Sequence, residues 1–505
     1  MRTFRRGLLA ATALVAATAV SGATATAPAA GADPTAVTDP KTVADPTAVT
    51  DSRTATDPVT QAAVAHPDEV SARLAEALRQ AVVAQDFKDV LDLTPPDQVA
   101  ASKAGAPEKY DSVAGEPERR LSAAAARPLH QMPNLDLTVI ELGRYGTPLG
   151  MADVLLSPQY PNGVVVPLDR RTLSTDQVRY RWWDDTEWDV NGGRGTRDVL
   201  AGRENAPIDF SSPYPASVLK LMVGFGVLRL ADQGRINLDS VYDYRPVTIN
   251  PACGGASSRV VRRHFDDMIT KSQNESTCAL IKLLHDLRAW DEVNRTFVEL
   301  GLPTLMVTGT NPDNGGRWIG SNMSSIDTAK LLLLVNGGHG TLWTTPAGRA
   351  VTRHVLSDAS RAQFLKSLYD QGHNEMLSTT NWCGRGYPVQ GIRQVTPPRW
   401  VKPDGTMTVG AAVYDRDVRP CDAVAEVRFG HKTGWVDTTG SDAGIVRSLP
   451  GKEPRNYIVV AFSNLGTDYV DTYRPADPPG VFPVLYTEKY AKLGAAVDRI
   501  VAGLR

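Results

Sequence analysis

A serine and a lysine three residues apart, Ser217 and Lys220, have types and a spacing that could support nucleophilic catalysis. A serine hydroxyl is a weak nucleophile until a base takes its proton, and a lysine amine can be that base when burial or nearby cations lower its pKa. On a helix, side chains at this spacing share a face, which places the amine near the hydroxyl. A chain of 505 residues can contain so short a pattern by chance, so the assignment needs further residues.

The stretch from Ser212 to Gly234 must position this pair, and its pattern predicts a buried helix. Apolar residues run almost without a break after Ser217, no proline interrupts them, and Gly234 is a typical C-terminal stop. The helix N-terminus offers free N–H groups and a positive field at the serine. An oxyanion formed there would be stabilised.

Two further stretches support the pair. Ser272 and Asn274 lie in the helical pattern Phe265–Leu287, and Lys432 follows the strand expected over Ala425–Phe429. Lys432 begins the sequence Lys-Thr-Gly. Each residue alone would be read as an ordinary surface polar group, but together they form an ordered set of three motifs.

Ser-x-x-Lys, Ser-x-Asn and Lys-Thr-Gly, in this order, resemble the signature of class A β-lactamases and penicillin-binding proteins. Gln273 departs from the aspartate that is usual in the second motif. The resemblance covers about residue 135 to the end of the chain. It implies an α/β (α+β) β-lactamase/transpeptidase-like fold, in which an antiparallel sheet is flanked by helices and carries an inserted all-helical subdomain.

The resemblance also implies a role for each matching residue. Ser217 would be the nucleophile and Lys220 its base, while Ser272 and Lys432 would relay protons. The oxyanion hole would use the backbone N–H groups of Ser217 and Trp435. The substrate would be bound by the remaining motif residues, Asn274, Thr433 and Gly434.

Hydrolysis of the acyl-enzyme is less well supported. Fast class A enzymes activate water with a glutamate between the second and third motifs, but no glutamate occurs between Leu300 and Ala329. The equivalent position falls at Asn311, whose neutral amide cannot take a proton from water. Asp313 could substitute if the loop is rearranged, and Glu275 is a weaker candidate.

These residues leave several functions open. The chain is expected to form an acyl-enzyme on Ser217 with an amide or ester substrate, either β-lactam-like or a cell-wall peptide, and to release it slowly. The alternatives are a degenerate, non-catalytic protein that binds β-lactams or peptides, and a D,D-peptidase. No metal or organic cofactor is indicated, and we expect a monomer that acts on a small molecule, a peptide or peptidoglycan.

The order of predicted elements suggests the domain organisation. Residues 1–27, with early arginines, an apolar run and small residues, are typical of a cleavable signal peptide of the Sec or Tat type and predict a secreted protein. Residues 28–65 form a low-complexity spacer, 66–134 a helical N-terminal region with a helix over Pro67–Leu93, and 135–505 the hydrolase domain. Within that domain 372–424 is an insertion. Strands precede and follow the helical part, and a last helix is expected from about Phe482 to Val501.

Charge and cysteine content limit the alternatives. The formal net charge of −2 gives no indication of nucleic-acid binding, and no segment after the signal is apolar for long enough to span a membrane. Four cysteines in an exported protein favour two disulfides. The pairs Cys253–Cys278 and Cys383–Cys421 each close a local loop and are preferred to a zinc site, because no Cys-x-x-Cys spacing occurs.

Overall fold

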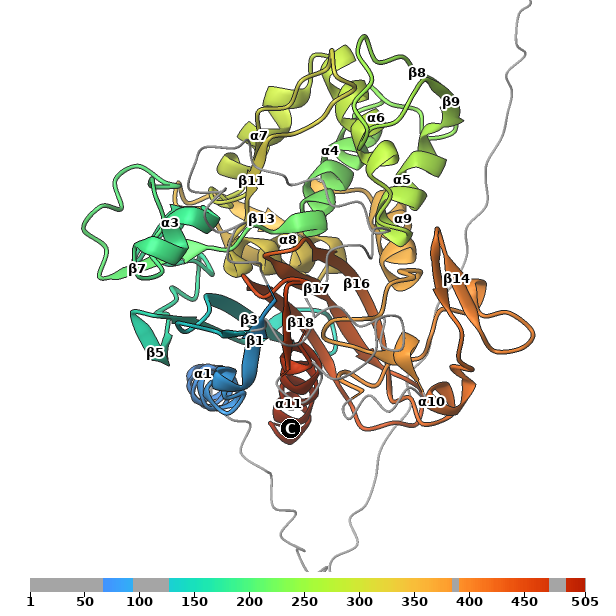
Figure 1. Ribbon diagram of the computed structural model, residues 1–505. Helices are drawn as coiled ribbons and strands as arrows, with labels where there is room; N and C mark the ends of the chain where they lie inside the picture. Colours follow the sequence, from blue (N-terminus) through green and yellow to red (C-terminus); the bar gives the residue numbers. More distant parts are fainter. Residues whose placement is uncertain (1–66, 94–126, 384–389, 472–486, 505) are drawn as a thin grey trace, which may run out of the picture. The chain divides into compact units, whose positions relative to one another are not determined.

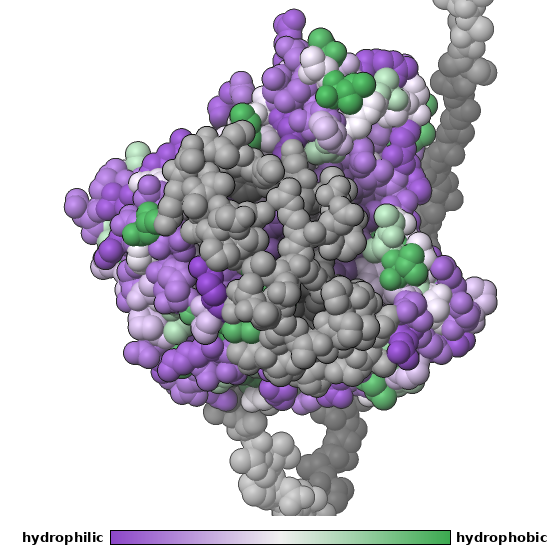
Figure 2. Space-filling model, viewed as in Figure 1, coloured by the Kyte–Doolittle hydropathy of each residue, from purple (hydrophilic) through white to green (hydrophobic). Residues whose placement is uncertain are grey.

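The computed structural model describes residues 67–93, 127–383, 390–471 and 487–504 (Figure 1). The predicted signal peptide and spacer lie outside these residues, as do residues 94–126 of the predicted N-terminal region. None of the described helices is long and apolar enough to cross a membrane. On the face shown in Figure 2, hydrophobic residues are scattered among hydrophilic ones.

A six-stranded antiparallel sheet forms the centre of the fold and joins two distant parts of the chain. Strands near residue 140 pair directly with strands near residue 460, so that Val139 lies opposite Val459. The sequence predicted that the two halves would be far apart in the chain, and this is confirmed. In order across the sheet, the strands are β16 (Val427–Trp435), β17 (Gly440–Ser448), β18 (Asn456–Ser463), β3 (Leu135–Leu142), β4 (Pro148–Ser157) and β5 (Tyr160–Val165).

The sheet is covered on both faces, because its strands are apolar on both sides. In β3, Ile140 and Leu142 face one core, whereas Leu137 and Val139 face a second. The first core includes the helices α4 (Lys220–Asp232) and α8 (Ser325–Asn336), and the second includes α1 (Pro67–Val83) and α11 (Lys489–Gly503). α1 packs against β4 and β5 and also touches α11. The helices that cover the sheet are α8 (Ser325–Asn336), α1 (Pro67–Val83) and α11 (Lys489–Gly503).

The helical subdomain is inserted between the two halves of the sheet, as predicted (Figure 1). Ser324 caps α8 by accepting a hydrogen bond from the Asp327 amide. The other helices of eight or more residues are α4 (Lys220–Asp232), α5 (Val261–Thr270), α6 (Asn274–Asp286), α7 (Trp290–Glu299) and α9 (Asp358–Tyr369). The short ones are α3 (Asp185–Val190) and α10 (Arg419–Ala423).

Several short strands form small sheets separate from the central six-stranded sheet. β6 (Val178–Trp182) runs parallel to β7 (Ile208–Ser212), and β14 (Met407–Val409) forms a hairpin with β15 (Ala412–Tyr414). One three-stranded sheet has the order β19 (Tyr469–Asp471), β1 (Val90–Asp92) and β2 (Arg127–Pro128). The remaining pairs are β8 (Val241–Tyr244) with β9 (Ser257–Val260), β10 (Met306–Thr308) with β11 (Gly320–Asn322), and β12 (Thr341–Thr344) with β13 (Ala350–Thr352).

Two predicted helices are wrong in extent. The first ends at Val83 instead of Leu93: Asp86 has a left-handed φ of 48°, and Val90–Asp92 forms a strand that pairs with β19. The pattern predicted as one helix over Phe265–Leu287 is broken into α5 and α6. The break lies at Ser272, whose φ is +57° and therefore incompatible with a right-handed helix.

The other expectations agree with the structure where it describes them. Gly234 follows α4 with a φ of +72°, as a helix stop requires. The first part of the expected C-terminal helix lies outside the described residues, and α11 begins at Lys489. Both preferred disulfides are present: Cys253 is bonded to Cys278, and Cys383 to Cys421.

Candidate active site

Ser217 lies where β7 turns into α4. The chain leaves β7 at Ser212, passes Ala216 with a left-handed φ of +46°, and forms one 3-10 turn before α4 begins at Lys220. A positive φ at a non-glycine residue costs free energy and occurs most often at functional sites. Within this turn Lys220 is buried, whereas Ser217 is partly exposed and accessible.

The Lys220 amine is the centre of the candidate site. Its Nζ lies 2.6 Å from Ser217 Oγ and 2.8 Å from Asn274 Oδ1. It also lies 2.8 Å from the Ser272 carbonyl oxygen and 3.2 Å from Ser272 Oγ. The first and second motifs are therefore joined by one nitrogen atom.

The environment of Lys220 favours the neutral amine. Burial holds the pKa of Lys220 well below its usual value, the charges of Lys432 and Arg317 lower it further, and Glu275 opposes them. A neutral amine has a lone pair and can accept the Ser217 proton. The contribution of Arg317 has no counterpart in the sequence motifs.

Ser272 connects this amine to the third motif. Lys432 Nζ donates to Ser272 Oγ at 3.0 Å and to its neighbour's carbonyl, Thr433 O, at 2.6 Å. Burial lowers the pKa of Lys432 to about 7, while Asp442 opposes this shift. The hydroxyl of Ser272 thus lies between two lysine nitrogens, as a proton relay requires.

Strand β16 runs directly beside Ser217. A Cβ atom at Gly434 would lie 2.6 Å from the Ser217 nitrogen and 2.8 Å from the Pro215 oxygen, so only glycine allows this approach. Ser441 Oγ donates to the Pro215 oxygen at 2.8 Å and so binds the turn that carries Ser217 to strand β17. Thr433 Oγ1 is buried and has no hydrogen-bond partner among the described residues.

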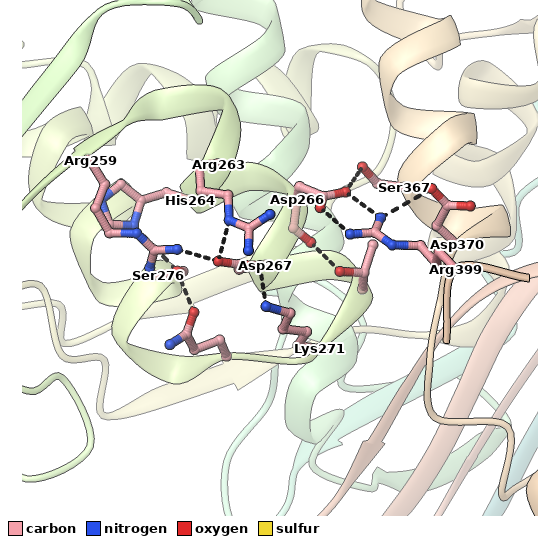
Figure 3. Close-up of polar contacts among 12 residues, drawn as sticks. Arg259, Arg263, His264, Asp266, Asp267, Lys271, Ser276, Ser367, Asp370 and Arg399 are labelled. Carbon is pink, nitrogen blue, oxygen red and sulfur yellow. Dashed lines mark hydrogen bonds and ion pairs between the residues drawn. The ribbon is translucent and has the colours of Figure 1, made fainter. Parts of the chain in front are cut away.

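A buried carboxylate that the sequence did not reveal supports the second motif. Asp267 is 1% exposed and forms ion pairs with Arg259, Arg263 and Lys271, which converge on it in Figure 3. Burial would raise the pKa of Asp267, but hydrogen bonds from Lys271 and Arg259 outweigh it and lower the pKa. The carbonyl of Asp267 also accepts from the Gln273 amide at 3.2 Å.

Gln273 occupies the position of the usual aspartate with a different set of contacts. Its Oε1 accepts from Ser276 Oγ at 2.9 Å, and its carbonyl accepts from Thr277 Oγ1 at 2.9 Å in the first turn of α6. The carboxylate nearby is that of Asp267, which pairs with Lys271, two residues before Gln273.

Asn311 and Asp313 are not joined to the other candidate residues. Asn311 Oδ1 accepts from the Asp313 amide at 2.9 Å, and the Asp313 carbonyl accepts from the Thr248 amide at 2.8 Å. Both side chains are exposed, and no hydrogen bond among the described residues links them to Ser217 or Lys220. Their role stays a prediction.

Comparison with known proteins yields one family match. Residues 197–386 match the model of the β-lactamase enzyme family. That segment contains the first two motifs, and the third lies beyond it. No curated protein matches the chain.

Several solved structures are similar at low sequence identity. PBP-A is 20% identical, with a TM-score of 0.35, over 57% of this chain and 80% of its own. A β-lactamase from Chitinophaga pinensis DSM 2588 is 18% identical, with a TM-score of 0.33, over 58% and 84%. A class A β-lactamase representative from Bacteroides cellulosilyticus DSM 14838 is 14% identical, with a TM-score of 0.36, over 74% and 92%.

The family match coincides with the segment that folds around Ser217 and Lys220. The antiparallel sheet and the inserted helical subdomain are those that the resemblance implied. Residues 197–386 of this chain are therefore similar to the β-lactamase enzyme family, and the fold is the β-lactamase/transpeptidase-like one that the resemblance implied.

Proposed function

We propose that this protein is a secreted serine hydrolase that forms an acyl-enzyme on Ser217 with an amide or ester substrate. One observation carries the proposal: a buried lysine amine of lowered pKa lies 2.6 Å from a partly exposed serine hydroxyl. This is the geometry that an activated serine requires, and the lowered pKa favours the neutral amine. The two disulfides are consistent with an oxidising compartment outside the cell.

Acylation uses the proton path between the motifs. The Ser217 proton passes to Lys220 Nζ as Oγ attacks the carbonyl carbon, and the oxyanion is stabilised by the N–H groups of Ser217 and Trp435. The proton then moves from Lys220 through the Ser272 hydroxyl to the leaving nitrogen or oxygen. The carbonyl–heteroatom bond breaks, an ester forms on Ser217, and Lys220 is neutral again.

The third motif is suited to bind an anionic substrate group. Thr433 Oγ1 is buried and has no partner among the described residues, which costs free energy unless a ligand satisfies it. Lys432 next to it supplies a positive charge when protonated. Together they fit a carboxylate of the kind that β-lactams and cell-wall peptides carry.

Slow deacylation follows from the loop after β10. The Asn311 amide cannot deprotonate water, and its oxygen is already bonded to the Asp313 backbone. An acyl-enzyme formed on Ser217 therefore lacks an evident base for its hydrolysis. Glu275 at the start of α6 is the acidic residue whose charge acts on Lys220, and it is the alternative base.

The test is a time course of labelling by a fluorescent penicillin, combined with turnover of a chromogenic cephalosporin. We expect rapid covalent labelling, slow loss of the label and slow turnover. Asn311→Glu is expected to speed loss of the label, whereas Asn311→Gln serves as the matched neutral control. Absence of label in the wild type would refute acylation and indicate a binding protein, and fast turnover would refute slow deacylation.

A further inference from the structure

The second motif is held by a segment about 100 residues further along the chain. Three successive carbonyl oxygens before Ser272 accept hydrogen bonds from three successive residues after α9. The Ile269 oxygen accepts from Gln371 Nε2 at 2.9 Å, and the Thr270 oxygen accepts from the Gly372 amide at 2.9 Å. The Lys271 oxygen accepts from His373 Nε2 at 3.2 Å.

These bonds explain why the helix stops where it does. Ser272 has a φ of +57°, which for a serine costs on the order of 1–3 kcal/mol and persists only where neighbouring groups enforce it. The carbonyls at the end of a helix lack partners within the helix. Residues 371–373 supply those partners and so fix the backbone that presents Ser272.

His373 also contacts the residue that directly follows the third motif. Its ring packs edge-on against Trp435, with the ring centres 5.5 Å apart and the planes at 78°. Trp435 directly follows Gly434, and its backbone is part of the proposed oxyanion hole. One side chain, 7% exposed, therefore touches both the residue that precedes the second motif and the residue that follows the third.

The orientation of His373 is defined at both ring nitrogens. Because the Lys271 carbonyl can only accept, Nε2 must carry a proton. Nδ1 faces Tyr414 Oη at 3.0 Å and Glu375 Oε1 at 3.4 Å. Tyr414 Oη also hydrogen-bonds Glu375 Oε1, so the three groups form one buried cluster.

The predicted insertion anchors this cluster to the helices. Arg399 bonds Asp266 in α5 at 2.9 Å and Asp370 at 3.1 Å, and Figure 3 shows its guanidinium between the two carboxylates. Trp382 packs on the ring of Tyr414, with centres 5.0 Å apart. Arg399 thus attaches the insertion to α5 and to Asp370 at the end of α9, whereas the contact of Trp382 with Tyr414 lies within the insertion.

We propose that His373 is a positioning residue for acylation: its Nε2–H holds the Lys271 carbonyl and its ring holds Trp435, which fixes the proton relay relative to the oxyanion hole. The role rests on the proposed function of Ser217. Displacing a catalytic group by about 1 Å can cost 100-fold in rate. Loss of His373 should therefore slow acylation more than it weakens substrate binding.

The test compares His373→Phe with His373→Gln. Phenylalanine keeps the ring beside Trp435 but cannot donate, whereas the glutamine Nε2 can still donate to the Lys271 oxygen. His339→Phe is the matched control, because it makes the same change in a ring stacked on Tyr145, away from the site. All variants are checked for a cooperative thermal transition.

Two measurements are made. Hydrogen exchange of the amides from Ser272 to Asn274 is expected to be at least about tenfold faster in His373→Phe and unchanged in His373→Gln and His339→Phe. The rate constant of acylation by fluorescent penicillin should fall about 10- to 100-fold in His373→Phe, with the non-covalent binding constant within about threefold of the wild type.

The outcomes separate the two proposals. Wild-type exchange in His373→Phe, or equal losses in the Phe and Gln variants, would overturn the positioning role. If the wild type is not acylated at all, the proposed function fails, and the exchange measurement still decides whether His373 fixes the Ser272 backbone.

Discussion

Removing the charge of Lys432 should move the pH dependence of acylation upward. Lys220 Nζ and Lys432 Nζ lie 3.2 Å and 3.0 Å from Ser272 Oγ, so they are at most about 6 Å apart. At an effective dielectric constant of about 20, two unit charges at that separation repel by about 3 kcal/mol, or roughly 2 pKa units. In Lys432→Gln the pKa of Lys220 should therefore rise by up to about 2 units.

The sign of the effect on rate follows from the role of Lys220. Acylation needs the neutral amine, so the rate rises with pH through the pKa of Lys220. A higher pKa shifts the midpoint of this rise to higher pH. Glu275→Gln removes a charge of the opposite sign and should shift the midpoint to lower pH, by a smaller amount because Glu275 is exposed to solvent.

The assay is the rate constant of acylation by a fluorescent penicillin, measured from about pH 5 to pH 10. The midpoint is used because Lys432→Gln should also lower the maximal rate by removing a substrate contact. Lys432→Arg keeps the positive charge and is expected to keep the midpoint near that of the wild type. A midpoint that stays in place, or that moves in the same direction in Lys432→Gln and Glu275→Gln, would refute Lys220 as the base.

Three further predictions concern the frame of the site. Burial raises the pKa of Asp136 to about 6, so as the pH rises from about 4 to 6 the folded state keeps a proton that the unfolded state has lost, and stability should fall. Burial also raises the pKa of its neighbour Asp153, so urea unfolding of Asp136→Asn should show a smaller decline over this window than the wild type, and an unchanged decline would contradict the shift at Asp136. The Cys383–Cys421 disulfide closes a loop of 38 residues, so by loop-closure entropy its reduction should destabilise the insertion by about 4 kcal/mol. Limited proteolysis should then cleave residues 390–421 earlier in the reduced protein than in the oxidised protein. Gly434→Ala should slow acylation at least about 100-fold, because the new Cβ would collide with the backbone of Ser217 and Pro215. The control Gly503→Ala places its Cβ where no atom lies within 4 Å and should leave the rate of acylation unchanged. Equal rates in the two variants would refute the close approach of β16 to Ser217.

Local spacing was enough to predict the contact between Ser217 and Lys220. Residues three apart share a face in a 3-10 turn as well as in an α-helix, so the contact survives although the first turn is 3-10. The disulfide pairs were also predictable, because each closes a local loop. The order of strands and helices similarly indicated a sheet built from both ends of the domain.

The break at Ser272 could not be predicted from local sequence. Apolar residues continue with helical period through α5 and α6, and the partners that stop α5 come from residues 371–373. Strand β16 was predicted to end at Phe429 but extends to Trp435. Its second half is buried and polar, so it lacks the apolar alternation by which strands are recognised.

Arg317 and His373 carry no sequence motif for a similar reason. Arg317 acts on Lys220 through its charge, and His373 acts through a backbone carbonyl and a ring contact. Such effects depend on distance in the folded chain and leave no fixed spacing in the sequence. Arg263 and Lys271 stand four residues before and after Asp267, a helical ion-pair spacing that the sequence does show, but the burial of this carboxylate and its pairing with Arg259 appear only in the fold.

Mapping the covalent label by peptide mass spectrometry tests the central claim most directly. After incubation with a fluorescent penicillin, wild-type protein should carry one acyl group, located on the peptide that contains Ser217, and Ser217→Ala should carry none. Label on another residue, or equal labelling of the Ser217→Ala variant, would contradict the assignment of Ser217 as the nucleophile.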